Sequence, residues 1–156
     1  MDDLNYSSSD VLAYIIRKCV QENVLFSITK GQKLLYCCYG MVLAVTGARL
    51  CDEHPVCWTF GPAFPQSYKD WKDGILNYDT PVIAAIDRDE KLSDIMLSTI
   101  RHFGKYSANA LVNWSHKPNS PWAICSGNGR YLDRAISDVL IADAFRPYLG
   151  DENEDQ

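Results

Sequence analysis

Two thiols and one imidazole lie within a short stretch of the sequence, as Cys51-x-x-His54-x-x-Cys57. Zn²⁺ binds Cys and His side chains in tetrahedral geometry, and a structural zinc site needs four such ligands. The fourth ligand would have to come from His102, His116 or Cys125. Nothing in the sequence brings any of these three residues to the cluster, so we expect no bound metal and no cofactor.

A cysteine hydrolase is the second chemistry that these residue types permit, since it needs a thiolate beside an imidazole and a third orienting group. The candidates in chain order are Cys37, Cys57, His116 and Asn119 or Asn128. Cys37 and Cys38 fall inside a predicted helix, where no helix N-terminus lowers the thiol pKa. The P-loop, dinucleotide-binding and His-Glu-x-x-His motifs are also missing from the sequence. We therefore expect a protein that is not an enzyme and has no catalytic residue.

A Gly-Pro turn flanked by aromatic residues, Trp58-x-x-Gly61-Pro62, follows the Cys and His residues. Gly61 permits backbone geometry denied to other residues and Pro62 makes the turn rigid, so the rings either pin the turn to the core or form a docking surface. A rigid surface loses little conformational freedom on binding, which favours docking. The candidates for partner contact are Phe60, Phe64, Tyr68 and Trp71. Both interpretations remain open.

A second candidate contact surface surrounds the loop from Pro118 to Pro121 and consists of Trp114, His116 and Trp122. A histidine at such a place commonly satisfies a turn. The alternative for His116 is a pH switch, because its ordinary pKa lies near physiological pH.

Hydrophobic periodicity predicts that helices position these residues. Thr29 and Gln32 have the spacing of a capping box, and Gly47 provides a left-handed end for the helix that follows them. Its predicted apolar stripe is Leu34, Leu35, Cys38, Met41, Val42 and Val45. Further helices are predicted to begin at Ser8, Ser9 or Asp10, at Pro65, at Asp87 or Asp89, at Ser107, and at Ser137 or Asp138.

Between the helices, Val56, Trp58 and Phe60 alternate with Cys57 and Thr59, which predicts a short strand with the first three side chains on one face. The stretch 78–81 is a predicted turn, and 82–86 is too short to assign. The sequence therefore predicts a mainly α fold, a compact single-domain helical bundle with a small β element in the Trp-x-x-Gly-Pro region.

The composition is that of an ordinary globular protein, with 156 residues of which 47% are hydrophobic and 22% are charged. The net charge of −5 argues against nucleic acid as a partner. No signal peptide begins the sequence and no apolar run could span a membrane, so we expect a cytoplasmic protein with its six cysteines reduced. Residues 1–149 are predicted to form the domain and 150–156 an acidic disordered tail.

Several segments together resemble the Panacea domain of SocA-type antitoxins and proteolytic adaptors. They are Gln32-Lys33-Leu34-Leu35-Tyr36, Thr46-Gly47-x-x-Leu50, Trp58-x-x-Gly61-Pro62-x-x-Pro65-x-x-Tyr68, and the stretch from Ile100 to Trp122. Gln32, Lys33, Trp58, Gly61 and Pro62 are its structural motif residues. The chain departs from the family pattern at two places. The position before Trp58 is usually a small apolar residue and is Cys57 here, and the interval between His116 and Pro121 usually carries an acidic residue but is Lys117-Pro118-Asn119-Ser120 here.

The resemblance implies an antitoxin that binds and neutralises a cognate toxin, directly or as an adaptor to a Clp-type protease, in a bacterial or phage toxin–antitoxin system. The alternative is a phage or mobile-element protein that inhibits or redirects a host protein without a cognate toxin. The resemblance leaves the oligomeric state and the identity of the toxin open.

Overall fold

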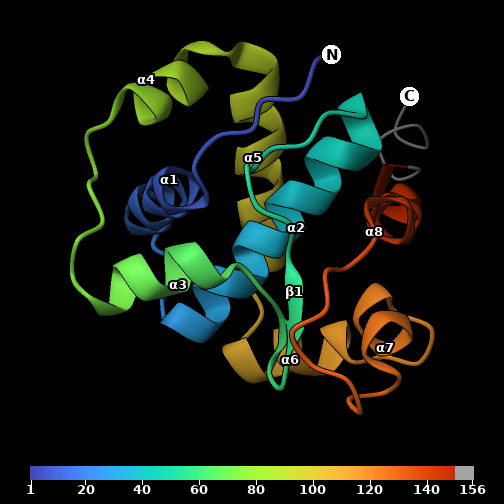
Figure 1. Cartoon of the computed structure of the whole chain (residues 1–156). Helices are drawn as coiled ribbons and strands as arrows, with labels where there is room; N and C mark the ends of the chain where they lie inside the picture. Colours follow the sequence, from blue (N-terminus) through green and yellow to red (C-terminus); the bar gives the residue numbers. More distant parts are fainter. Residues whose placement is uncertain (150–156) are drawn as a thin grey trace.

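The structure is a computed structural model that describes residues 1–149, and helices form most of this part of the chain (Figure 1). In chain order the elements are α1 (Ser8–Gln21), α2 (Ile28–Thr46), β1 (Val56–Trp58), β2 (Gly61–Ala63), α3 (Pro65–Lys72), α4 (Pro81–Arg88), α5 (Glu90–Phe103), α6 (Ala108–Ser115), α7 (Pro121–Ser126), α8 (Asp138–Phe145) and a 3-10 helix, η1 (Arg146–Leu149). This confirms the predicted mainly α fold with a small β element. The predicted acidic tail, 150–156, lies outside the described residues.

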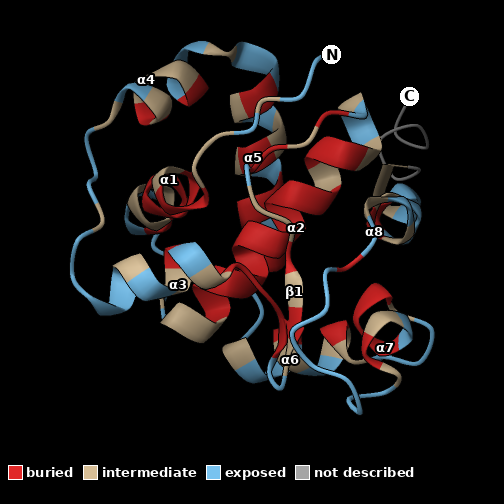
Figure 2. Ribbon diagram, in the orientation of Figure 1, coloured by how far each residue is buried: buried red, intermediate tan, exposed pale blue. Residues whose placement is uncertain are grey.

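Helix α2 is the centre of the fold, because α1, α5, α6 and α8 all pack against it. Figure 2 shows it buried along most of its length. The predicted apolar stripe is confirmed at Leu34, Leu35, Cys38 and Val42, which are fully buried, but it is wrong at its C-terminal end and too narrow. Val45 is exposed and Met41 is half-buried, whereas Lys33 and Tyr39 are fully buried. A helix surrounded by other elements buries nearly all its faces, and a stripe marks a helix at the surface.

The predicted capping box at the start of α2 is also wrong. Ser27 is the N-cap, and its hydroxyl accepts a hydrogen bond from the backbone N–H of Lys30. Gln32 instead points into the core, where its amide oxygen accepts from the backbone N–H of Phe64 at 2.7 Å and its amide nitrogen donates to the Ser67 hydroxyl at 3.0 Å. Gln32 thereby joins α2 to the start of α3. The predicted end is confirmed, with Gly47 left-handed at φ 76°.

Strands β1 and β2 form an antiparallel hairpin in which Cys57 pairs with Pro62. Cys57 is the buried residue of β1, while Val56 and Trp58 are half-buried, so the burial alternates as predicted and the buried face is the one that carries Cys57. Gly61 has φ 107°, and a Cβ there would lie 2.5 Å from the Ser115 hydroxyl oxygen. Backbone geometry and close packing therefore both require glycine at position 61.

Two short helices, α4 and α7, were not predicted from the sequence. Thr80 caps α4 by accepting from the backbone N–H of Ile83, and Ser120 caps α7 by accepting from that of Ala123. A proline occupies the first turn of each helix, where its missing N–H costs nothing. In both cases a Thr or Ser followed directly by Pro marks the start of a helix.

The remaining predicted helices are confirmed, with differences at their ends and faces. Helix α1 has Ser7 at its N-cap and leaves Val20 exposed. Asp89, Ser107 and Ser137 cap α5, α6 and α8. On α8 the buried side is formed by Ile141 and Phe145, whereas Leu140 is half-buried and Ala144 is exposed. Within residues 1–149, no helix is both long enough and apolar enough to cross a membrane.

Candidate protein-binding surface

Of the Cys and His residues that could have held zinc, only Cys57 and Cys125 have their side chains in contact in the described residues, with sulfurs 3.9 Å apart. Cys51 and Cys57 are fully buried, whereas His54 is partly exposed and lies 3.5 Å from a carboxylate oxygen of Asp138. Among residues 1–149, no three His, Cys, Asp or Glu side chains are arranged to hold a metal ion. Burial also raises the pKa of the Cys37 thiol well above its ordinary value, the opposite of what a nucleophile needs.

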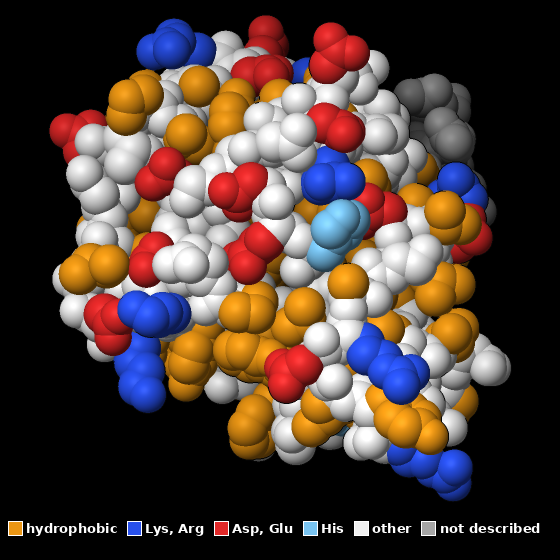
Figure 3. Space-filling view, viewed as in Figure 1, with side chains coloured by type: hydrophobic (Ala, Val, Ile, Leu, Met, Phe, Trp, Pro, Cys, Tyr) orange, Lys and Arg blue, Asp and Glu red, His pale blue; other side chains and the backbone are white. Residues whose placement is uncertain are grey.

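Four aromatic side chains on the hairpin and α3 form what we call the aromatic surface: Trp58, Phe60, Tyr68 and Trp71. Phe60, at the hairpin turn, is 65% exposed, and Trp71 is 36% exposed. The rings of Trp58 and Tyr68 meet edge to face with centroids 5.3 Å apart. Figure 3 shows hydrophobic side chains gathered in the lower half of this face, where the hairpin and α3 lie in Figure 1.

The surface is held in place by hydrogen bonds to α7 and to the loop between α7 and α8. Trp58 donates its ring N–H to a carboxylate oxygen of Asp133 at 2.8 Å, and its backbone carbonyl accepts from the Trp122 ring N–H at 2.7 Å. The backbone N–H of Cys57 donates to the carbonyl of Arg134. A surface held this way loses little conformational freedom on binding.

Phe64 does not belong to this surface, which corrects its assignment as an exposed docking residue. Its side chain is fully buried and packs against the Tyr39 ring at a centroid distance of 5.6 Å. Tyr39 in turn donates its hydroxyl to Asp138 at 2.6 Å. Because Phe64 joins α2 to the start of α3, it positions the surface from beneath.

The motif residue Lys33 is 2% exposed, and its ammonium donates to the carbonyl of Pro62 at 3.0 Å. Burial lowers the pKa of Lys33 to about 8. The lysine stem lies under the hairpin turn, where a Cβ on Gly61 would be 2.7 Å from the lysine Cε. Lys33 therefore supports the hairpin, as Gln32 supports the start of α3.

The three residues of the second candidate surface, Trp114, His116 and Trp122, do not all have the same neighbours. Trp122 is buried and stacks on His116, with ring centroids 3.9 Å apart. Burial, together with the nearby charge of Lys33, lowers the pKa of His116. Trp114 donates its ring N–H to the Tyr148 hydroxyl and contributes to a pocket of about 430 Å³. That pocket is lined by His102, Phe103, Tyr106, Ala110, Leu111, Asn113, Trp114, Lys117 and Tyr148 and shares no residue with the aromatic surface.

Sequence reasoning missed Asp133, which bonds Trp58, and the buried position of Lys33. Asp133 follows the turn at 126–129 with a left-handed backbone, φ 60°, which is unusual for a residue other than glycine. No spacing in the sequence connects it to Trp58. Lys33 stands between the mostly polar residues 29–32 and the apolar run that begins at Leu34, so its burial follows from the elements packed around α2 and not from its neighbours in the sequence.

Comparison of the chain with known proteins identifies its family. The family model described as "Antitoxin SocA-like, Panacea domain" matches residues 32–123, which include all four residues of the aromatic surface. The chain therefore belongs to the SocA-like antitoxin family with a Panacea domain. Antitoxin SocA of Caulobacter vibrioides (strain NA1000 / CB15N) is 30% identical, over 99% of this chain and 95% of that protein. No solved structure gave a significant match.

Proposed function

We propose that the protein is an antitoxin that neutralises a cognate toxin by binding it stoichiometrically through the aromatic surface. The family supports a toxin as the partner and a regulatory role without catalysis. The observation that carries the proposal is the exposure of Phe60 and Trp71 beside the paired rings of Trp58 and Tyr68. Trp and Tyr are enriched among residues that dominate protein interfaces.

The charges near this surface favour a toxin with a basic contact region. Asp70 lies on α3 between Tyr68 and Trp71, and Glu53 accepts from the backbone N–H of Gln66 at the start of the same helix. Neither carboxylate belongs to an ion pair among residues 1–149. Figure 3 shows acidic side chains on the same face, above the hydrophobic group.

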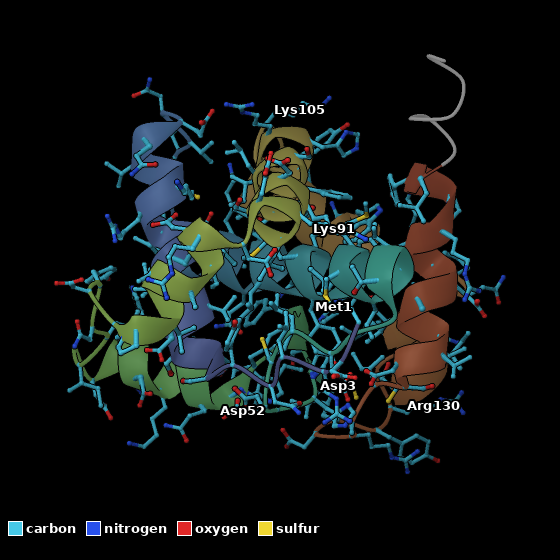
Figure 4. All side chains as sticks on the ribbon, turned by 90° about the horizontal axis from the view of Figure 1, so that it is seen from above. Met1, Asp3, Asp52, Lys91, Lys105 and Arg130 are labelled. Carbon is cyan, nitrogen blue, oxygen red and sulfur yellow. The ribbon has the colours of Figure 1, made fainter. Side chains whose placement is uncertain are left out.

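Neutral donors hold these carboxylates in place. The Ser9 hydroxyl donates to Asp70 at 2.6 Å, the Ser8 hydroxyl donates to Glu53, and the Ser8 backbone N–H donates to Asp52. Figure 4, seen from above, places Asp52 beside the start of α1 and α3. Lysine or arginine side chains on the toxin would therefore meet fixed, unneutralised carboxylates at the edge of the aromatic surface.

Co-expression tests the proposal. Each reading frame adjacent to the gene is expressed with and without this protein, and both growth and copurification are measured. We expect one neighbour to be toxic alone, and to be neutralised and copurified when this protein is present. A protein that copurifies with a host protein but rescues no neighbour would contradict the proposal. If the toxin disappears only in cells with an active Clp protease, the neutralisation proceeds by delivery to that protease.

A further inference from the structure

Two thiols meet directly beneath the aromatic surface. The Sγ atoms of Cys57, on β1, and Cys125, on α7, lie 3.9 Å apart, although the residues are 68 positions apart in the chain. A disulfide has an S–S length of about 2.05 Å, so small rotations of the two side chains would bring the sulfurs to bonding distance. The contact joins the strand that carries Trp58 to a helix that is remote in sequence.

Both thiols make hydrogen bonds that are readily given up. Cys57 donates to the carbonyl of Tyr131 and Cys125 donates to that of Ala135, each at 3.2 Å. Thiols are weak donors, so losing these bonds costs little. Both carbonyls belong to the loop that follows α7, and this loop carries mostly exposed residues, so water can satisfy them after the sulfurs have moved.

The other cysteines are shielded from oxidants. Cys19, Cys37, Cys38 and Cys51 are fully buried, whereas Cys125 is half-buried near the chain surface. A small oxidant therefore reaches Cys125 first, and the thiol nearest to that sulfur is Cys57. Access and proximity together select this pair.

We propose that Cys57 and Cys125 form an intrachain disulfide when the protein meets a peroxide. The Cys125 thiolate attacks one peroxide oxygen, which breaks the O–O bond, releases hydroxide and leaves a sulfenic acid on Cys125. The Cys57 sulfur then attacks the Cys125 sulfur and displaces the second hydroxide. The two hydroxides take up the two thiol protons, so one peroxide is reduced to two waters as the disulfide forms.

The disulfide would fix the hairpin to α7 by a covalent bond. Because the bond closes a long loop, it removes many conformations from the unfolded chain and stabilises the folded protein. It would also hold Trp58, the neighbour of Cys57 in β1, more firmly over Trp122, whose ring N–H already bonds the Trp58 carbonyl. Oxidation would therefore stabilise the support of the aromatic surface while leaving its exposed rings unchanged.

The test treats the purified full chain with hydrogen peroxide, then unfolds it and alkylates the free thiols. We expect two of the six cysteines to escape alkylation and the intact mass to fall by two hydrogens. Tryptic digestion should give a cross-link between peptides 50–69 and 106–130. Because the first peptide contains both Cys51 and Cys57, fragmentation must assign the bond to Cys57. The melting temperature should rise by about 5 °C or more, and dithiothreitol should reverse the rise.

The Cys125→Ser variant is the control, and Cys57→Ala is the second variant should Cys125→Ser fold poorly. Both should keep all their thiols free under the same treatment. Burial and the adjacent Cys57 raise the pKa of Cys125 to about 11, so little thiolate is present at pH 7, the reaction is slow there, and its rate should rise about tenfold per pH unit from 7 to 9. A sulfinic acid on Cys125 without the cross-link, a bond between chains, or a bond that involves Cys51 would overturn the proposal.

Discussion

At the scale of single residues, the motif side chains act mainly by supporting the hairpin. Gln32 bonds the backbone of Phe64, and Lys33 bonds the carbonyl of Pro62. Both come from α2, so the most buried helix of the fold fixes the turn on which Phe60 is exposed. Gln32 and Lys33 therefore hold the aromatic surface in place without forming part of it.

The pH dependence of stability tests the burial of Lys33. Its folded pKa of about 8 lies below the ordinary lysine value of 10.5, so the charged amine destabilises the folded state in full below about pH 8. This cost disappears as the pH rises through the interval between the two values. Relative to Lys33→Met, the wild-type protein should gain roughly 3 kcal/mol of unfolding free energy between pH 8 and 10.5. Urea unfolding of both proteins across this range measures it, and a constant difference would show that Lys33 is solvated.

Phe64 should behave as a core residue. Phe64→Ala should lower the free energy of unfolding by about 3–5 kcal/mol, because it leaves a cavity between α2 and α3. Phe60→Ala should change it by less than about 0.5 kcal/mol, since that ring is largely in solvent. Thermal or urea unfolding of the two variants makes the comparison. Equal effects would mean that Phe64 is not packed as described.

At the scale of elements, the sequence predicted what depends on local signals and missed what depends on neighbours. Gly47 ended α2 as expected, and Ser107 and Ser137 began their helices. For β1, alternation predicted two faces, while the elements packed around the strand decide which of them is buried. Likewise, the exposure of Phe60 and the burial of Phe64 depend on how α3 lies against α2.

The start of α2 offers a matched pair of substitutions. Ser27→Ala removes the hydroxyl that accepts from the Lys30 backbone and should cost about 1 kcal/mol. Thr29→Ala, at the position that the capping-box spacing favoured, should change stability by only a few tenths of a kcal/mol. Chemical denaturation of both variants measures this. A larger loss of stability in Thr29→Ala than in Ser27→Ala would show that Thr29 is the N-cap of α2.

At the scale of the whole molecule, a core formed mainly by the central α2 and its neighbours supports one aromatic face. Residues 150–156 contain no apolar side chain that could add to a core, so we predict that they are dispensable for folding. Deleting them should change the free energy of unfolding by less than about 1 kcal/mol. A larger loss in a thermal melt would show that this segment packs on the domain.

Titration against the toxin tests whether the exposed aromatic side chains bind it. Purified Phe60→Ala and Trp71→Ala are titrated against the toxin that the wild-type protein neutralises. Leu25→Ala is the control, because Leu25 is 87% exposed and lies outside the aromatic surface. We expect Kd values raised roughly 5- to 1,000-fold for the first two variants, which corresponds to about 1–4 kcal/mol, with unchanged melting curves and a wild-type Kd for Leu25→Ala. Wild-type affinity in the Phe60→Ala/Trp71→Ala double variant would contradict it.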